Sequence, residues 1–231
     1  MTASAVDLVR DAWDAACERV ALAATKAGRA DDAVAILLAT KTVPGLAIRA
    51  AIAAGANLIG ENRVQEMVAK APELTDVPHE THLIGPLQRN KARAAAGIAT
   101  CIQTVADSRI AERLSNLTAA PLSVMIQVNT SNEASKSGCH PDEALDLAGA
   151  VAALPGLRVT GFMTIGLNSP SVRDVAESFR VLRRIRDRAQ TSGLPDASQL
   201  SMGMSADLEI AIAEGATMVR LGSAVFGPRE G

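Results

Sequence analysis

The sequence predicts an α/β fold, a (β/α)8 TIM barrel with an extra helix before its first strand. Helical and extended patterns alternate from end to end, which is typical of a parallel sheet whose strands are joined by helices. About eight extended segments occur, the number that a closed barrel needs. The chain has 231 residues, of which 48% are hydrophobic, enough for one sizeable core. We therefore expect a single domain over residues 1–231.

The first half of the chain reads as a leading helix followed by four strand–helix units. The leading helix has one apolar face at helical spacing, made by Val6, Val9, Trp13, Ala16 and Val20. The run VAILLAT has the length and the β-branched content of a buried strand. The expected strands lie at 34–40, 57–59, 81–84 and 101–105, and the expected helices at 45–54, 63–70 (ending near Pro72), 88–96 and 108–117.

The second half repeats this alternation. The run SVMIQV marks the clearest strand, and a polar loop over 129–140 follows it. Pro141 fits the first turn of the next helix, where a backbone N–H is not needed. Ser169 and Pro170 open the longest helix. The expected strands lie at 122–128, 157–163, 199–201 and 217–221, and the other helices at 141–154 and 206–214.

Composition excludes several classes of function. The net charge of −2 and the pI near 6.0 do not favour binding to nucleic acid or to an anionic membrane. No apolar stretch is long enough to span a bilayer, and the acidic amino-terminal segment does not resemble a signal peptide. Three separated cysteines without a C-x-x-C motif indicate reduced thiols in the cytoplasm, and the histidines lack metal-ligand spacing. We expect a cytoplasmic protein without a metal.

Lys41 directly follows the first predicted strand, at the end where the active sites of such barrels lie. Poor solvation at this place favours the neutral, nucleophilic amine over the ammonium ion. A neutral amine can form a Schiff base with a carbonyl compound. The alternative is an ordinary solvated lysine that begins a loop.

Two further strand ends suggest a cradle for an anion. Ser205 is expected at the start of a helix, where free N–H groups favour phosphate, and Gly222 allows close approach of a ligand to the backbone. The alternatives are a plain helix cap at Ser205, a turn glycine at Gly222 and a surface ion pair at Arg220. A phosphate cradle opposite an amine suggests a phosphorylated aldehyde, and the cofactor that matches is pyridoxal 5'-phosphate.

Seven strings, in order over residues 39–227, resemble the YggS/PROSC family of pyridoxal phosphate homeostasis proteins. They are ATKTVP, GENRVQE, HLIGPLQRNK, EASKSG, GFMTIG, LSMGMSADLEIAI and VRLGSAVFG. The family is similar to the isolated barrel of fold-type III enzymes such as alanine racemase. The resemblance therefore implies a fold-type III barrel that binds pyridoxal phosphate.

The resemblance also implies roles for individual residues. Lys41 would carry the cofactor as a Schiff base. Arg220 would face either the pyridine nitrogen or the phosphate. The phosphate would be held by Ser205 and by the backbone of Gly222 and Ser223. The remaining cofactor-binding candidates are Asn62 in the ring pocket, Lys136 near the phenolic oxygen, and His82, Met163 and Ser201.

Two departures from the racemases concern catalysis. Those enzymes take a tyrosine from a second domain as a proton-transfer group, whereas this chain contains no tyrosine. A guanidinium at the ring nitrogen would disfavour its protonation and weaken carbanion chemistry. The sequence thus favours a carrier in pyridoxal phosphate homeostasis, without an assigned catalytic residue, over the alternative of a small racemase or lyase. The other hypotheses are that it is a monomer and that it passes the cofactor to apo-enzymes by transient contact.

Overall fold

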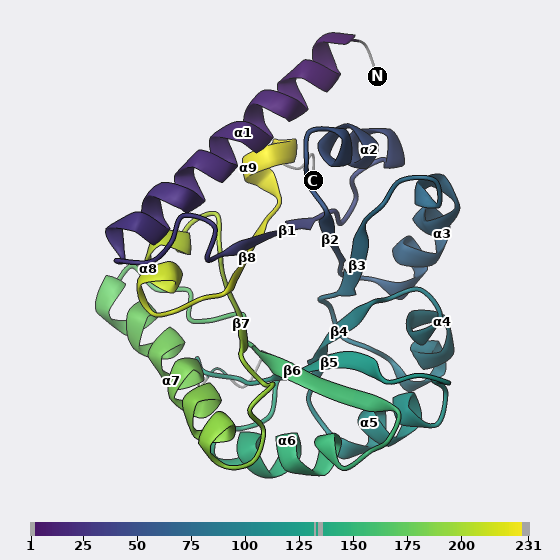
Figure 1. Cartoon of the computed structure of the whole chain (residues 1–231), viewed down its shortest axis with the longest axis vertical. Helices are drawn as coiled ribbons and strands as arrows, with labels where there is room; N and C mark the ends of the chain where they lie inside the picture. Colours follow the sequence, from purple (N-terminus) through teal and green to yellow (C-terminus); the bar gives the residue numbers. More distant parts are fainter. Residues whose placement is uncertain (1–2, 132, 134–135, 228–231) are drawn as a thin grey trace.

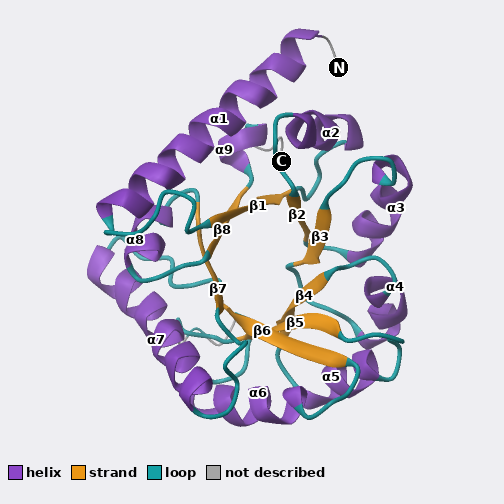
Figure 2. Ribbon diagram, viewed as in Figure 1, coloured by secondary structure: helices purple, strands orange, loops and turns teal. Residues whose placement is uncertain are grey.

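Eight parallel strands close into a barrel in chain order, and β1 pairs with β8 to complete it (Figures 1 and 2). The computed structural model describes residues 3–131, 133 and 136–227. This architecture confirms the predicted fold class. The strands are β1 (Ala35–Ala39), β2 (Leu58–Glu61), β3 (Glu80–Leu83), β4 (Cys101–Val105), β5 (Leu122–Gln127), β6 (Leu157–Met163), β7 (Gln199–Met204) and β8 (Met218–Leu221).

The helices surround the barrel and connect its strands (Figure 2). Two short 3-10 turns, η1 (Arg89–Lys91) and η2 (Pro141–Glu143), precede α4 and α6. The α-helices are α1 (Ala3–Lys26), α2 (Gly45–Ala53), α3 (Val64–Leu74), α4 (Ala92–Ala96), α5 (Ser108–Ser115), α6 (Ala144–Ala152), α7 (Val172–Thr191), α8 (Leu208–Ala213) and α9 (Ser223–Phe226).

Helix α1 is the expected extra helix, and it packs against α2, α8 and α9 beside the place where β8 meets β1 (Figure 1). Its apolar face, which includes Trp13, is buried. The guanidinium of Arg19 donates two hydrogen bonds, of 2.7 and 2.8 Å, to the carboxylate of Glu209 on α8. An apolar face and an ion pair thus fix α1 across the closure of the barrel.

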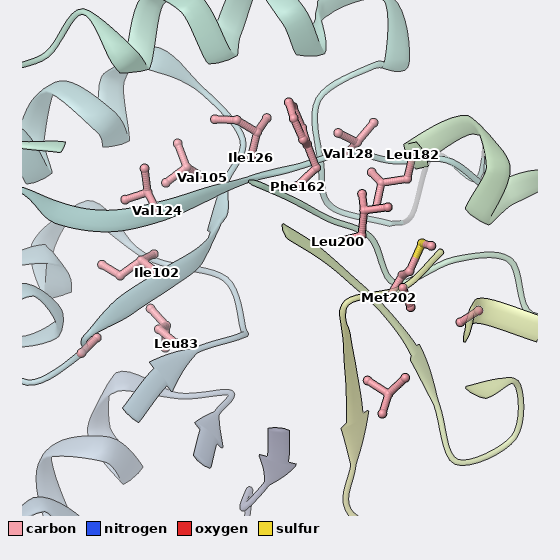
Figure 3. Close-up of a cluster of buried hydrophobic side chains, with 14 of the residues drawn as sticks. Leu83, Ile102, Val105, Val124, Ile126, Val128, Phe162, Leu182, Leu200 and Met202 are labelled. Carbon is pink, nitrogen blue, oxygen red and sulfur yellow. The ribbon is translucent and has the colours of Figure 1, made fainter. Parts of the chain in front are cut away.

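The strands are covered on both faces, so successive side chains enter two different apolar clusters. Outward side chains such as Val124, Phe162 and Leu200 meet the helices, as Figure 3 shows for Leu182 of α7. Inward side chains form a smaller cluster inside the barrel. Its buried members are Leu37, Leu58, Cys101, Met125, Met163 and Met218.

Several helix boundaries differ from the prediction by a few residues, and two of the differences have a clear physical reason. Helix α3 continues through Pro72 to Leu74 instead of ending before the proline. Val68, four residues earlier, is exposed, so water can bind the carbonyl that Pro72 leaves without a donor. Helix α8 begins at Leu208 because Asp207 closes a turn onto Met204. Among the described helices, none combines the length and the apolar character needed to cross a membrane.

Candidate functional site

Lys41 follows β1 at the carboxyl-terminal end of the barrel and lines a cavity of about 330 Å³. Asn62, which follows the neighbouring strand β2, lines the same cavity. The resemblance assigns both residues to the cofactor pocket, and the structure brings them to the wall of one cavity. The other lining residues are Arg63, Val64, Gln65, Pro86, Gln88 and Lys91.

The backbone around Lys41 forms a tight turn. The amide of Val43 donates to the carbonyl of Thr40 over 2.9 Å, which closes the turn around Lys41 and Thr42. Thr42 has a φ of 62°, the left-handed region that glycine normally occupies at this position of a turn. Lys41 is thus carried by a sharply bent and strained segment.

Arg220 projects from β8 and is almost completely buried. Its guanidinium donates to the hydroxyl oxygen of Ser201 over 2.9 Å and to the carbonyl of Thr164 over 2.7 Å. Burial lowers the pKa of Arg220 to about 10, against the opposing effect of the Asp207 charge. No carboxylate of the described residues forms an ion pair with it. The alternative of a surface ion pair is wrong, because Arg220 is buried and its partners are the neutral oxygens of Ser201 and Thr164.

Ser201 begins a hydrogen-bonded chain that crosses the interior of the barrel. Because Arg220 can only donate, the Ser201 hydroxyl accepts from it and donates to Oε1 of Gln103 over 2.6 Å. Gln103 then donates through Nε2 to Nδ1 of His82 over 2.8 Å. This polarity assigns the proton of a neutral His82 to Nε2.

His82 lies within β3, inside the barrel rather than at the strand end. It lines a cavity of about 390 Å³ together with Cys101 and Arg158, and not the Lys41 cavity. Burial lowers the pKa of His82, while Glu80, whose Oε2 lies 3.5 Å from Nε2, opposes this shift. His82 is therefore connected to Arg220 by hydrogen bonds through Gln103 and Ser201, and it does not line the Lys41 cavity itself.

Met163 is buried in the cluster inside the barrel, directly beside Ser201 in the pairing of β6 with β7. The residue after it, Thr164, supplies the carbonyl that holds Arg220. Met163 thus packs inside the barrel next to the partners of Arg220.

The proposed phosphate cradle lies at two adjacent strand ends. Ser205 belongs to the turn that Met204 and Asp207 close, so it does not cap α8 as expected. Gly222 and Ser223 follow β8 and line a larger cavity of about 670 Å³. Thr42 lines this second cavity as well. The turn that carries Lys41 therefore borders both cavities.

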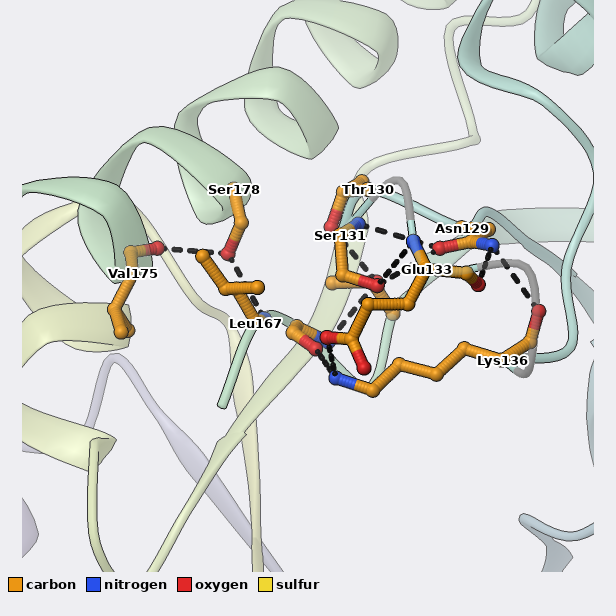
Figure 4. A network of polar contacts seen from close by, with 10 residues as sticks. Asn129, Thr130, Ser131, Glu133, Lys136, Leu167, Val175 and Ser178 are labelled. Atoms are coloured by element: carbon orange, nitrogen blue, oxygen red, sulfur yellow. Dashed lines mark hydrogen bonds and ion pairs between the residues drawn. The ribbon is translucent and has the colours of Figure 1, made fainter. Parts of the chain in front are cut away.

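Lys136 forms contacts within the loops that follow β5 and β6 (Figure 4). Its Nζ donates to Oε1 of Glu133 over 2.7 Å and to the carbonyl of Gly166 over 2.8 Å. It does not line the Lys41 cavity. In this structure its charge is used to join the two loops.

Sequence reasoning did not identify three residues that support the site. Gln103 lies in the buried strand β4, where a polar side chain in an apolar run is a usable signal. Glu66 and Lys70 stand four positions apart on α3, as in many ordinary surface ion pairs, and nothing in their spacing indicates the turn that they contact.

Comparison with known proteins identifies the family. The family model of the alanine racemase N-terminal domain matches residues 14–230. The pyridoxal phosphate homeostasis protein of Pseudomonas aeruginosa is 45% identical over 215 residues, covering 92% of each chain, and that of Escherichia coli K12 is 43% identical over 223 residues, covering 92% of this chain and 93% of its own.

A solved structure extends the similarity to a protein with the cofactor in place. PipY of Synechococcus elongatus, solved with pyridoxal phosphate bound, has a TM-score of 0.78 and 34% identity, with 84% of this chain and 93% of that chain covered. Together with the matched barrel and the strand-end residues, these similarities show that the chain belongs to the family of pyridoxal phosphate homeostasis proteins, which are built on the alanine racemase N-terminal domain fold.

Proposed function

We propose that this chain binds pyridoxal phosphate at the carboxyl-terminal end of its barrel and acts in intracellular cofactor homeostasis and delivery. The observation that carries the proposal is Arg220, a buried guanidinium held only by neutral oxygens at the strand ends near which Lys41 lies. A buried cation that forms no ion pair with a carboxylate of the described residues favours a ligand that supplies an anionic group or a lone pair. The name of the curated relatives and the bound cofactor in PipY support the same ligand.

The residues present fit this ligand. Pyridoxal phosphate supplies an aldehyde that forms an imine with a primary amine. Lys41 provides that amine at the wall of the cavity, and Asn62 provides polar contact beside it. The turn at Ser205 and the backbone at Gly222 and Ser223 would hold the phosphate. Arg220 would bind the pyridine nitrogen or the phosphate from inside the barrel.

The alternative of a racemase or lyase needs a second proton-transfer group besides Lys41. His82 lines the cavity at the other end of the barrel. Cys139 is buried, and burial raises the pKa of its thiol to about 11. Neither group is suited to proton transfer at a substrate, and the chain has no tyrosine. These facts favour a carrier over a racemase or lyase. We propose in addition that it acts in the cytoplasm and transfers the cofactor by transient contact.

The decisive experiment is reduction of the purified protein with borohydride after addition of pyridoxal phosphate. We expect one phosphopyridoxyl group on Lys41, located by peptide mass spectrometry, and none in a Lys41→Ala variant. Lys91 lines the same cavity, so a Lys91→Arg variant is the matched control and should label fully. An adduct mainly on another lysine, or on none, would contradict the proposal.

The racemase alternative needs a separate measurement. We expect amino acids incubated with the loaded protein in deuterium oxide to exchange their Cα hydrogen no faster than with free cofactor. Faster exchange that depends on Lys41 would favour the alternative.

A further inference from the structure

The turn that carries Lys41 holds a conformation that its sequence does not favour. Thr42 is β-branched, and such a residue is rarely found at a φ near +60°. A glycine or an asparagine would adopt this conformation without comparable strain. The strain persists only if neighbouring groups hold the turn in place.

Helix α3 supplies those groups to both sides of Lys41. On one side, the amide of Thr42 donates to Oε2 of Glu66 over 2.9 Å. On the other side, the carbonyl of Thr40 accepts from Nζ of Lys70 over 2.7 Å. Both bonds are charge-assisted, the stronger class of hydrogen bond. The two peptide groups that flank Lys41 are therefore fixed from one helix face.

Glu61, at the end of β2, ties Lys70 and Thr40 to the protein interior. Its Oε1 accepts from Nζ of Lys70 over 2.7 Å and from the hydroxyl of Thr40 over 2.6 Å. Glu61 is buried and the Lys70 side chain is only 13% exposed, so water screens this contact weakly. Glu66 lies 3.6 Å from Lys70 and completes the group.

We propose that Glu66 and Lys70 are positioning residues for Lys41. They hold Thr42 in its left-handed conformation, and they thereby aim the Lys41 side chain into the cavity that it lines with Asn62. This inference rests on the proposed function, since it assigns to Lys41 the task of bonding the cofactor's aldehyde. Glu66 and Lys70 act through the backbone of the turn, and they do not contact the reacting atoms themselves.

The test uses the strained residue as a probe. In Glu66→Ala, trapping of pyridoxal phosphate on Lys41 by borohydride should slow about tenfold, the effect of losing one charge-assisted hydrogen bond. In a Thr42→Gly background the same change should slow trapping less than about threefold, because glycine holds a positive φ without help. A merely structural role of Glu66 would lower the melting temperature in both backgrounds and show no such rescue.

The matched control is Asp76→Ala. It removes an exposed ion pair between Arg49 on α2 and the loop after α3, without touching the turn, and trapping should stay at the wild-type rate. The inference is overturned if Glu66→Ala slows trapping equally with threonine and with glycine at position 42. It is also overturned if Glu66→Ala does not slow trapping at all.

A second readout separates this inference from the proposed function. In the protein without added cofactor, hydrogen exchange at the Thr42 amide, followed by NMR, should quicken about tenfold in Glu66→Ala and remain unchanged in Asp76→Ala. If the wild-type protein forms no adduct on Lys41, the proposed function fails while this measurement still decides whether Glu66 holds the turn. Unchanged exchange in Glu66→Ala would show that it does not.

Discussion

Arg220 is an almost completely buried guanidinium, and proteins ordinarily balance such a charge with a carboxylate. Here the oxygens that hold it, from Ser201 and Thr164, are neutral. The desolvation of the guanidinium is therefore only partly offset in the protein alone. An acceptor on a ligand would offset more of this desolvation, so Arg220 should strengthen ligand binding. It should add little to the free energy of unfolding of the protein without ligand.

Replacing Arg220 by methionine tests this division between binding and stability. Arg220→Met should weaken pyridoxal phosphate binding about tenfold or more, since one strong donor is lost. Its free energy of unfolding without cofactor should stay within roughly 1 kcal/mol of wild type or rise, because a buried charge is removed. Spectroscopic titration and urea unfolding measure the two quantities. Unchanged affinity together with a large loss of stability would assign Arg220 a structural role instead.

We expect His82 to make the stability of the barrel depend on pH. Burial lowers its pKa below the ordinary value of 6.5, so the unfolded chain takes up the proton first as the pH falls. The stability that neutral His82 contributes is therefore complete above about pH 6.5 and is lost below it. A protonated Nδ1 would also face the Nε2 donor of Gln103.

The variant His82→Asn isolates this effect. Asparagine can still accept from Gln103 through its side-chain oxygen, but it does not titrate. Urea unfolding between about pH 7.5 and about pH 5 should show a shallower loss of stability in the variant than in wild type. Parallel curves for the two proteins would rule out His82 as the titrating group.

At the scale of elements, Gly85 allows the segments after β2 and β3 to lie against each other. A Cβ atom there would lie 2.0 Å from the carbonyl oxygen of Asn62, which is a backbone atom and cannot rotate away. Asn62 lines the Lys41 cavity, so this close approach also sets the shape of that wall. The glycine in the string IGPLQ is therefore required by packing rather than by its own φ.

The variant Gly85→Ala should lose about 2–4 kcal/mol of unfolding free energy, because the two segments must separate. Gly149→Ala in α6 is the matched control, since nothing lies within 4 Å of its Cβ position. That change should stabilise the protein by about 0.5–1 kcal/mol through helix propensity. Urea unfolding of both variants gives the comparison. Similar stabilities for the two would mean that the contact at Asn62 relaxes at no cost.

The elements show how far sequence reasoning reaches. The apolar runs at 34–40 and 122–128 predicted buried strands, because the alternation of strands and helices and the burial of both faces leave a clear pattern. The end of α3 at Pro72 was misplaced, since an exposed proline late in a helix costs less than one in a buried turn.

For the candidate site, the common location of Lys41 and Asn62 was predictable because both residues stand next to strand ends. The place of His82 was not, because strand alternation decides that a side chain points inward but the stagger between strands decides its depth in the barrel. The contacts of Glu66 and Lys70 with the turn at Thr42 depend on how α3 packs, which the sequence pattern does not state.

At the scale of the whole molecule, α1 stabilises the region where β8 pairs with β1, because it packs against helices from both ends of the chain. Trp13→Ala should cost about 3–5 kcal/mol of unfolding free energy, because it empties the buried face of α1. Leu22→Ala on the same helix is the control, since Leu22 is 56% exposed, and it should change stability by less than about 0.5 kcal/mol. Equal effects would place the stabilising face of α1 elsewhere.

The position of α1 also orders events during synthesis. It is made well before α8 and α9, against which it packs. The strand that follows it, β1, likewise completes the barrel only with β8. These contacts join the most distant parts of the chain, and such contacts form slowly. Part of the apolar face of α1 therefore stays uncovered in the nascent chain until α8 and α9 have been made, and an uncovered apolar face is prone to aggregation during that interval.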